Sequence, residues 1–103
     1  LCVNPMQEKV NDLLAMAQDA KDGFDNACGA TDNTRTKQAA LRKFRSELLR
    51  LYQMQTEMTA NVTSDSEKAL TDGLLSELER INRAVHESIG FTYMPLDQLA
   101  ALQ

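Results

Sequence analysis

Three stretches of the chain repeat apolar residues at alternating intervals of three and four. The middle stretch is the clearest, because only Gln55 interrupts its row. The members of that row are Leu41, Phe44, Leu48, Leu51, Met58 and Val62. This spacing places the row on one face of an α-helix, close to the seam of a coiled coil. Since one helix does not bury such a row alone, the pattern predicts partner helices.

The stretches on either side supply those partners. The first row is Met6, Val10, Leu13, Ala17, Ala20, Phe24 and Ala27, and the third is Leu70, Leu74, Leu78, Ile81, Val85 and Ile89. We therefore expect helices over about residues 5–28, 34–60 and 66–89. Short connections between three long helices predict one all-α domain over residues 1–103, an antiparallel up-down-up three-helix bundle. Its expected core contains Leu41, Phe44, Leu48, Leu51, Leu78, Ile81 and Val85.

Polar residues and glycines at the ends of these rows indicate where the helices begin and stop. Asn4 is a good N-cap, and Pro5 is favoured at the first helical position. Ser64, followed three residues later by Glu67, fits a capping box for the third helix. Gly90 is expected to end that helix. The second helix has three candidate N-caps, namely Thr31, Asp32 and Thr34.

The segment after the third row is too apolar to be a free tail. Pro95 interrupts it, and a short helix after Pro95 would put its leucines on one broad face. About two turns do not hold a helix in water without packing. Two alternatives follow: the segment folds back over the end of the bundle, or it docks into a partner or a second copy as a helix in a groove. The candidate partner-binding residues are Phe91, Tyr93, Met94, Leu96, Leu99 and Leu102.

Charge and hydropathy narrow the function classes. The net charge is −4, whereas nucleic-acid binding is expected to need a basic face. No apolar run approaches ~20 residues, so no membrane span is expected. The middle helix is basic and its neighbours are acidic, which favours a central middle helix with opposite charges facing it. Exposed ion pairs contribute only about 0–1 kcal/mol each, so charge selects the arrangement more than it stabilises it.

The two cysteines flank the first predicted helix. A helix of that length, about 34 Å, keeps Cys2 and Cys28 far beyond the roughly 4.4–6.8 Å that a disulfide allows between Cα atoms. The sequence therefore predicts no bridge between them within one molecule. Free thiols, an intermolecular bridge and a helix broken near Gly23 remain as alternatives. Without a nearby histidine or further cysteine, no zinc site is expected.

His86 is the only histidine. The string His86-Glu87-Ser88-Ile89-Gly90 resembles the histidine-phosphotransfer domains of phosphorelays, which are helical bundles with Gly four residues after the phosphorylated His. Those domains carry a basic residue where this chain has Ile89. The resemblance implies a phosphocarrier that uses His86. Its position beside the third row instead predicts a solvated surface side chain.

Two further motifs concern secretion. Asn61-Val62-Thr63 matches a glycosylation sequon in a predicted turn. Residues 93–97, Tyr-Met-Pro-Leu-Asp, resemble the Tyr-x-x-x-Asp export signal of the small helical-hairpin proteins secreted by type VII systems. The Trp-x-Gly turn of that family is absent. Both the cytoplasm and secretion therefore stay open as locations.

The carboxylates follow helical-surface spacing, and no acid/base pair, nucleophile triad, phosphate-cradling loop or cofactor motif is recognisable. We therefore expect a non-enzymatic protein–protein interaction module, such as a helical adaptor, a secretion chaperone or an assembly subunit. Its expected partner is another protein, with a second copy of the chain as one option, bound through helix packing. Methionines on or near the rows, at positions 16, 54 and 58, suit adaptable contacts. The alternatives are a phosphocarrier using His86 and an extracellular structural or toxin-like bundle.

Overall fold

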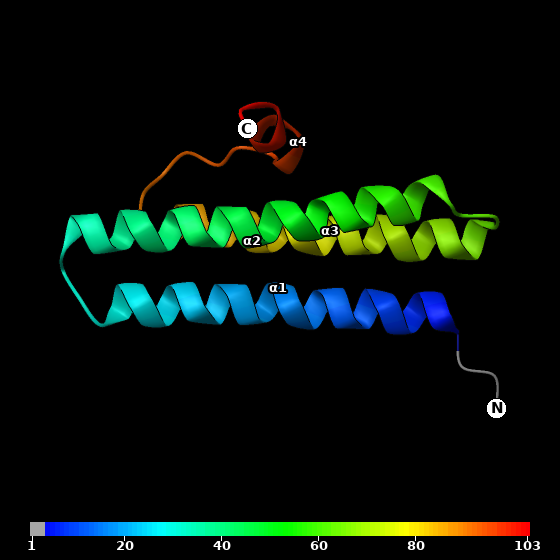
Figure 1. Cartoon of the computed structure of the whole chain (residues 1–103), viewed down its shortest axis with the longest axis horizontal. Helices are drawn as coiled ribbons and strands as arrows, with labels where there is room; N and C mark the ends of the chain where they lie inside the picture. The colour runs from blue at the N-terminus through cyan, green and yellow to red at the C-terminus, as the bar shows by residue number, and fades with distance from the viewer. Residues whose placement is uncertain (1–3) are drawn as a thin grey trace.

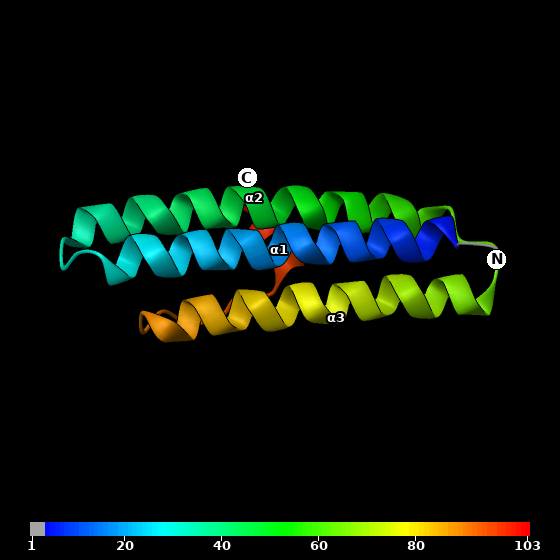
Figure 2. The same cartoon turned by 90° about the horizontal axis from the view of Figure 1, so that it is seen from below.

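The computed structural model describes residues 4–103 and contains four helices and no strand in that range. The helices are α1 (Pro5–Gly29), α2 (Thr34–Ala60), α3 (Asp65–Ser88) and α4 (Leu96–Ala101). The three long helices run antiparallel to their neighbours in sequence, and each packs against the other two (Figures 1 and 2). The predicted all-α three-helix bundle with a short C-terminal helix is thus confirmed. The ends of the long helices lie within one residue of the predicted ones.

Side chains cap the beginnings of all three long helices. Asn4 Oδ1 accepts a hydrogen bond of 3.0 Å from the backbone N–H of Met6, as expected. The cap of α2 is Asn33, whose Oδ1 accepts from the N–H groups of Arg35 and Thr36. The prediction of Thr31, Asp32 or Thr34 as this cap is therefore wrong. Thr31 instead braces the turn, because its Oγ1 accepts from the N–H of Asn33.

The capping box of α3 forms in a modified way. Ser64 Oγ accepts from the N–H of Glu67, as predicted. The Glu67 carboxylate contacts Thr63, the residue before the N-cap, and accepts hydrogen bonds from both its hydroxyl and its backbone N–H. These two hydrogen bonds lower the pKa of Glu67, because they favour its charged form. The turn between α2 and α3 is therefore fixed from the α3 side.

The core consists of the three apolar rows. All seven residues predicted for it are buried, together with Val10, Leu13, Ala17, Ala20, Phe24, Met58, Leu74, Leu96 and Leu99. The rings of Phe24 and Phe44 pack with their centroids 5.8 Å apart, which joins α1 to α2. Gln55, which interrupts the middle row, is buried too. Its Nε2 donates to the backbone carbonyl of Thr71 at 3.0 Å and so links α2 to α3.

Helix α1 continues without a break through Gly23. The alternative of a helix broken at that glycine is therefore wrong. Cys28 lies in the last turn of α1, and its side chain is half-buried. Cys2 lies outside the described residues, so the absence of a bridge between the two stays a prediction.

The charged residues do not pair across the bundle as expected. The ion pairs within residues 4–103 each join two residues of one helix, and they are Lys21–Asp25, Lys68–Asp72 and Glu77–Arg80. Moreover, α1 packs directly against α3, so α2 is not a central helix between them. Helix packing is set by the apolar rows, since exposed charges contribute too little to determine it.

Candidate interaction site at the C-terminal segment

The C-terminal segment, residues 90–103, leaves α3 through a tight reversal. Gly90 has φ +74°, a conformation that favours glycine, and its N–H donates to the carbonyl of Glu87. The N–H of Phe91 donates to the carbonyl of His86 at 2.9 Å, which completes a Schellman motif. The chain then runs back along the face of α2 and α3 that lies opposite α1 (Figures 1 and 2). It therefore covers a side of the bundle, and the expectation that it covers the end is wrong.

Two side chains of α3 hold the backbone of this segment. Asn82 Nδ2 donates to the carbonyl of Met94 at 2.8 Å and to Glu79 Oε1 at 3.1 Å. The Glu79 carboxylate accepts from the N–H of Leu96, the first residue of α4, at 3.1 and 3.2 Å. The residue before α4, Pro95, provides no side-chain cap. Glu79 therefore supplies the cap that α4 lacks, with a negative charge at the helix N-terminus.

Tyr93 adds a third contact to the same part of α3. The guanidinium of Arg83 lies 4.4 Å from the centroid of its ring, a cation–π geometry. Partial burial raises the pKa of the Tyr93 hydroxyl, and the neighbouring Glu79 carboxylate raises it further. Residues 92–95 are not helical. The Tyr-x-x-x-Asp string of residues 93–97 therefore lies mainly in a non-helical segment that is bound to α3.

His86 lies in the same region and is fully buried, so the prediction of a solvated side chain is wrong. Its Nε2 is 3.0 Å from Nε of Arg45 on α2, and its Nδ1 is 2.8 Å from the carbonyl of Asn82. Because the Arg45 N–H only donates, Nε2 must accept, and Nδ1 then carries the proton. Burial lowers the pKa of His86, and the Arg45 charge lowers it further, against the opposing effect of the Asn82 carbonyl. Neither ring nitrogen is open to a phosphoryl donor in this arrangement.

The residues predicted to bind a partner divide into three groups. Leu96 and Leu99 are buried against the bundle, so they serve the fold. Tyr93 and Met94 are half-buried. Phe91 and Leu102 remain exposed, with 43% and 72% of their surface accessible. The binding of these six residues to a partner stays a prediction, and in this conformation Phe91 and Leu102 are the most accessible of them.

The docked segment creates a groove between α2 and α4. Its volume is 530 Å³, and its apolar surface comes mainly from Leu49, Tyr52 and Ala100. The remaining walls are formed by Ser46, Arg50, Gln53, Thr56, Glu57 and Gln103. Leu102 lies between two of the lining residues in the chain. Without α4 in place one wall of this groove would be missing.

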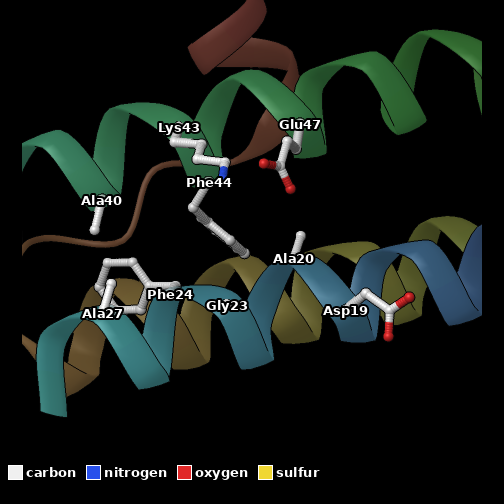
Figure 3. Close-up of a pocket in the computed structure, with 9 residues that line it drawn as sticks. All are labelled: Asp19, Ala20, Gly23, Phe24, Ala27, Ala40, Lys43, Phe44 and Glu47. Carbon is white, nitrogen blue, oxygen red and sulfur yellow. The ribbon is translucent and has the colours of Figure 1, made fainter. Parts of the chain in front are cut away.

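A second, smaller hollow of 160 Å³ lies between α1 and α2 (Figure 3). Its sides are small residues, namely Ala20, Gly23, Ala27 and Ala40, and the aromatic rings of Phe24 and Phe44 lie between them. The alanines of α1 thus leave a hollow beside these rings. Its rim mixes one cation, Lys43, with the carboxylates of Asp19 and Glu47, so it favours no ligand charge (Figure 3).

The basic face of α2 consists of its four exposed cations, Arg35, Arg42, Lys43 and Arg50. This helix carries six of the eleven Lys and Arg residues and two of the fifteen Asp and Glu residues. Its cations are Arg35, Lys37, Arg42, Lys43, Arg45 and Arg50. Over the described part of the chain, none of them has a carboxylate oxygen within 4.0 Å. The interpretation of this face as one paired with acidic neighbours is therefore wrong.

The described residues contain no group of three or more potential metal-ligating side chains, and none of their helices is long and apolar enough to cross a membrane. Comparison of the chain with protein-family models, with curated proteins and with solved structures gives no match. Function must therefore be inferred from surfaces. Sequence reasoning missed Glu79 and Asn82, and it considered His86 without predicting its burial. The spacing of three and four residues between these positions on α3 marks a polar row beside the apolar one.

Proposed function

We propose that this chain is a protein–protein interaction module that binds its partner in the groove between α2 and α4. The observation that carries the proposal is the groove itself, an apolar depression of 530 Å³. The exposed Leu102 lies in the chain between two residues that line it, Ala100 and Gln103. Exposed apolar surface of this kind is costly for a monomer and is typical of binding sites. No catalytic chemistry is assigned to the chain.

The fold supports this proposal because both sides of the groove belong to helices that are held in position. Leu49 and Tyr52 project from the long helix α2, whereas Ala100 belongs to α4, which Glu79 and Asn82 hold in position. A partner helix that enters the groove therefore meets a preformed surface and pays little ordering cost. This is the helix-in-groove mode of recognition.

A photo-crosslinking amino acid at Gln53, in the groove, tests the proposal in the native host. The matched control position is Asn26, which is exposed on α1. We expect a discrete adduct from position 53 that is absent from position 26 and is lost when Leu49→Asp is added, provided that circular dichroism shows the variant folded. An adduct of twice the chain mass would identify a second copy as the partner. Equal labelling at both positions, or none at position 53, would contradict the proposal.

A further inference from the structure

The basic face and the apolar groove of α2 form one continuous surface. Arg35, Arg42, Leu49 and Thr56 follow one another at seven-residue intervals, so they lie along one side of the helix. The two arginines are exposed, and they precede the groove, which begins at Ser46. Arg50, also exposed, lines the groove next to Leu49. The row from Arg35 to Thr56 is about 32 Å long at 1.5 Å per residue, which matches a helix of about 20 residues.

We propose that the partner segment is an amphipathic helix with acidic residues at one end. Its apolar residues would occupy the groove at Leu49 and Tyr52, and its acidic end would lie over Arg35 and Arg42. The inference deepens the proposed function and rests on it. Charge complementarity carries it, because these arginines have no carboxylate within 4.0 Å over residues 4–103. Glu57 at the opposite end of the groove disfavours a partner that is acidic along its whole length.

A protein helix fits this surface better than a long polyanion does. Eleven of the fifteen carboxylates lie on α1 and α3, so a nucleic acid that extends beyond α2 meets like charge on both sides. The cations also continue directly into an apolar groove, and a phosphate backbone leaves such a groove empty. An amphipathic helix uses both halves of the surface. Its acidic end selects the orientation, and its apolar residues provide most of the buried area.

The test measures binding of two labelled synthetic peptides by fluorescence anisotropy. Both are 21-residue amphipathic helices with leucines at the same positions; one carries glutamates in its first half and the other carries lysines there. We expect the acidic peptide to bind at least about 10-fold more tightly than the basic one at low salt, with the difference shrinking as salt is added.

Matched variants locate the binding. Arg42→Glu should weaken binding of the acidic peptide about 5-fold or more. Lys9→Glu, which reverses another exposed cation on α1, should change the affinity for that peptide less than about 2-fold. The inference is overturned if neither peptide binds, if both bind equally, or if Arg42→Glu has no effect. Tighter association with phosphatidylserine vesicles than with the peptide would overturn it as well.

The two proposals fail separately. If Leu49→Asp abolishes peptide binding but Arg42→Glu does not change it, the groove is a binding site and its partner is not selected by charge. The crosslink at Gln53 is independent of any assumption about the partner's charge. Its absence would overturn the proposed function, whatever the peptides do.

Discussion

At the scale of single residues, His86 on α3 links α2 to the part of α3 that holds the C-terminal segment. It accepts a hydrogen bond from Arg45 on α2 and donates one to the carbonyl of Asn82, whose side chain holds Met94. Asn82 Oδ1 is the one buried side-chain polar atom without a partner among the described residues. The polar cluster that holds the C-terminal segment is therefore satisfied except at this one acceptor, and an unpaired buried polar atom makes the cluster less stable.

The buried neutral state of His86 makes stability depend on pH. Its pKa is lowered on folding, so the unfolded chain binds the proton more readily than the folded one. The stability that depends on neutral His86 is therefore fully present above the unfolded pKa of about 6.5, and it is lost as the pH falls toward the lower folded pKa. We expect the free energy of unfolding in urea to fall between pH 7.5 and 5.5, by at most about 1.4 kcal/mol per pH unit from this one group.

The control for this prediction is His86→Gln, which keeps a donor and an acceptor but does not titrate. Its stability should change less than that of the parent over the same pH range. An identical pH dependence in both proteins would mean that His86 is not the group responsible.

Two glycines should respond to alanine in opposite directions. A Cβ at Gly23 meets no atom within 4 Å, so Gly23→Ala should stabilise the protein by about 1 kcal/mol through helix propensity. Gly90 also has free space, but its φ of +74° strains any other residue, and Gly90→Ala should cost about 1–2 kcal/mol. Thermal unfolding of both variants checks the pair. A stabilised Gly90→Ala would show that the reversal after α3 is not left-handed.

The roles of single residues were predicted best where they depend on residues nearby in the sequence. The caps at Asn4 and Ser64 depend on neighbours within three residues, and both form. The cap at Asn33 was missed because four polar residues in one short turn compete for the same role. The burial of Gln55 and His86 depends on partners 16 and 41 residues away, so no local pattern contains it.

At the scale of elements, α2 contributes its apolar row to the whole bundle, and Leu48 lies near the middle of that row, fully buried. Leu48→Ala removes buried methyl groups and leaves a cavity, so it should reduce the free energy of unfolding by about 2–5 kcal/mol. That is a large share of the roughly 5–15 kcal/mol typical of a domain. Urea unfolding followed by circular dichroism measures it. A variant as stable as the parent would show that this row faces solvent.

The C-terminal segment should contribute to stability through its two buried leucines. Deletion of residues 92–103 should lower the melting temperature by several degrees, for a loss of roughly 1–2 kcal/mol. Leu96→Ala should reproduce most of that loss, whereas Leu102→Ala, at an exposed position, should change stability by less than about 0.5 kcal/mol. If the deletion leaves the melting temperature unchanged, the segment is not docked on α2 and α3.

Long elements were predictable and the short one was only partly so. The rows of α1, α2 and α3 each repeat over about five or six turns, which is enough to predict the type, length and buried face of the element. Helix α4 has six residues, and its position depends on Glu79 and Asn82 of another element. Its leucines indicated that the segment would pack against other apolar residues, but no pattern in residues 91–103 predicts packing against the side of the bundle.

At the scale of the whole molecule, charge and apolar surface are distributed unevenly. Helix α2 concentrates the cations, α1 and α3 concentrate the carboxylates, and the ion pairs of the described residues stay within single helices. The apolar rows therefore account for the fold, and the unused charge is available for recognition. The sequence predicted the charge of each helix but not which surfaces stay free, because that depends on how the bundle is covered.

The account depends most on the docked C-terminal segment, because α4 forms one wall of the groove. Amide hydrogen exchange followed by NMR tests this docking directly. The N–H of Leu96 is bonded to Glu79, and that of Leu99 to the carbonyl of Pro95, so both should exchange far more slowly than the exposed Thr92. Glu79→Ala should remove the protection of Leu96 while α1 and α2 stay protected. Exchange of Leu96 and Leu99 at the rate of an unfolded chain, with the long helices protected, would contradict the docked segment and the groove that it forms.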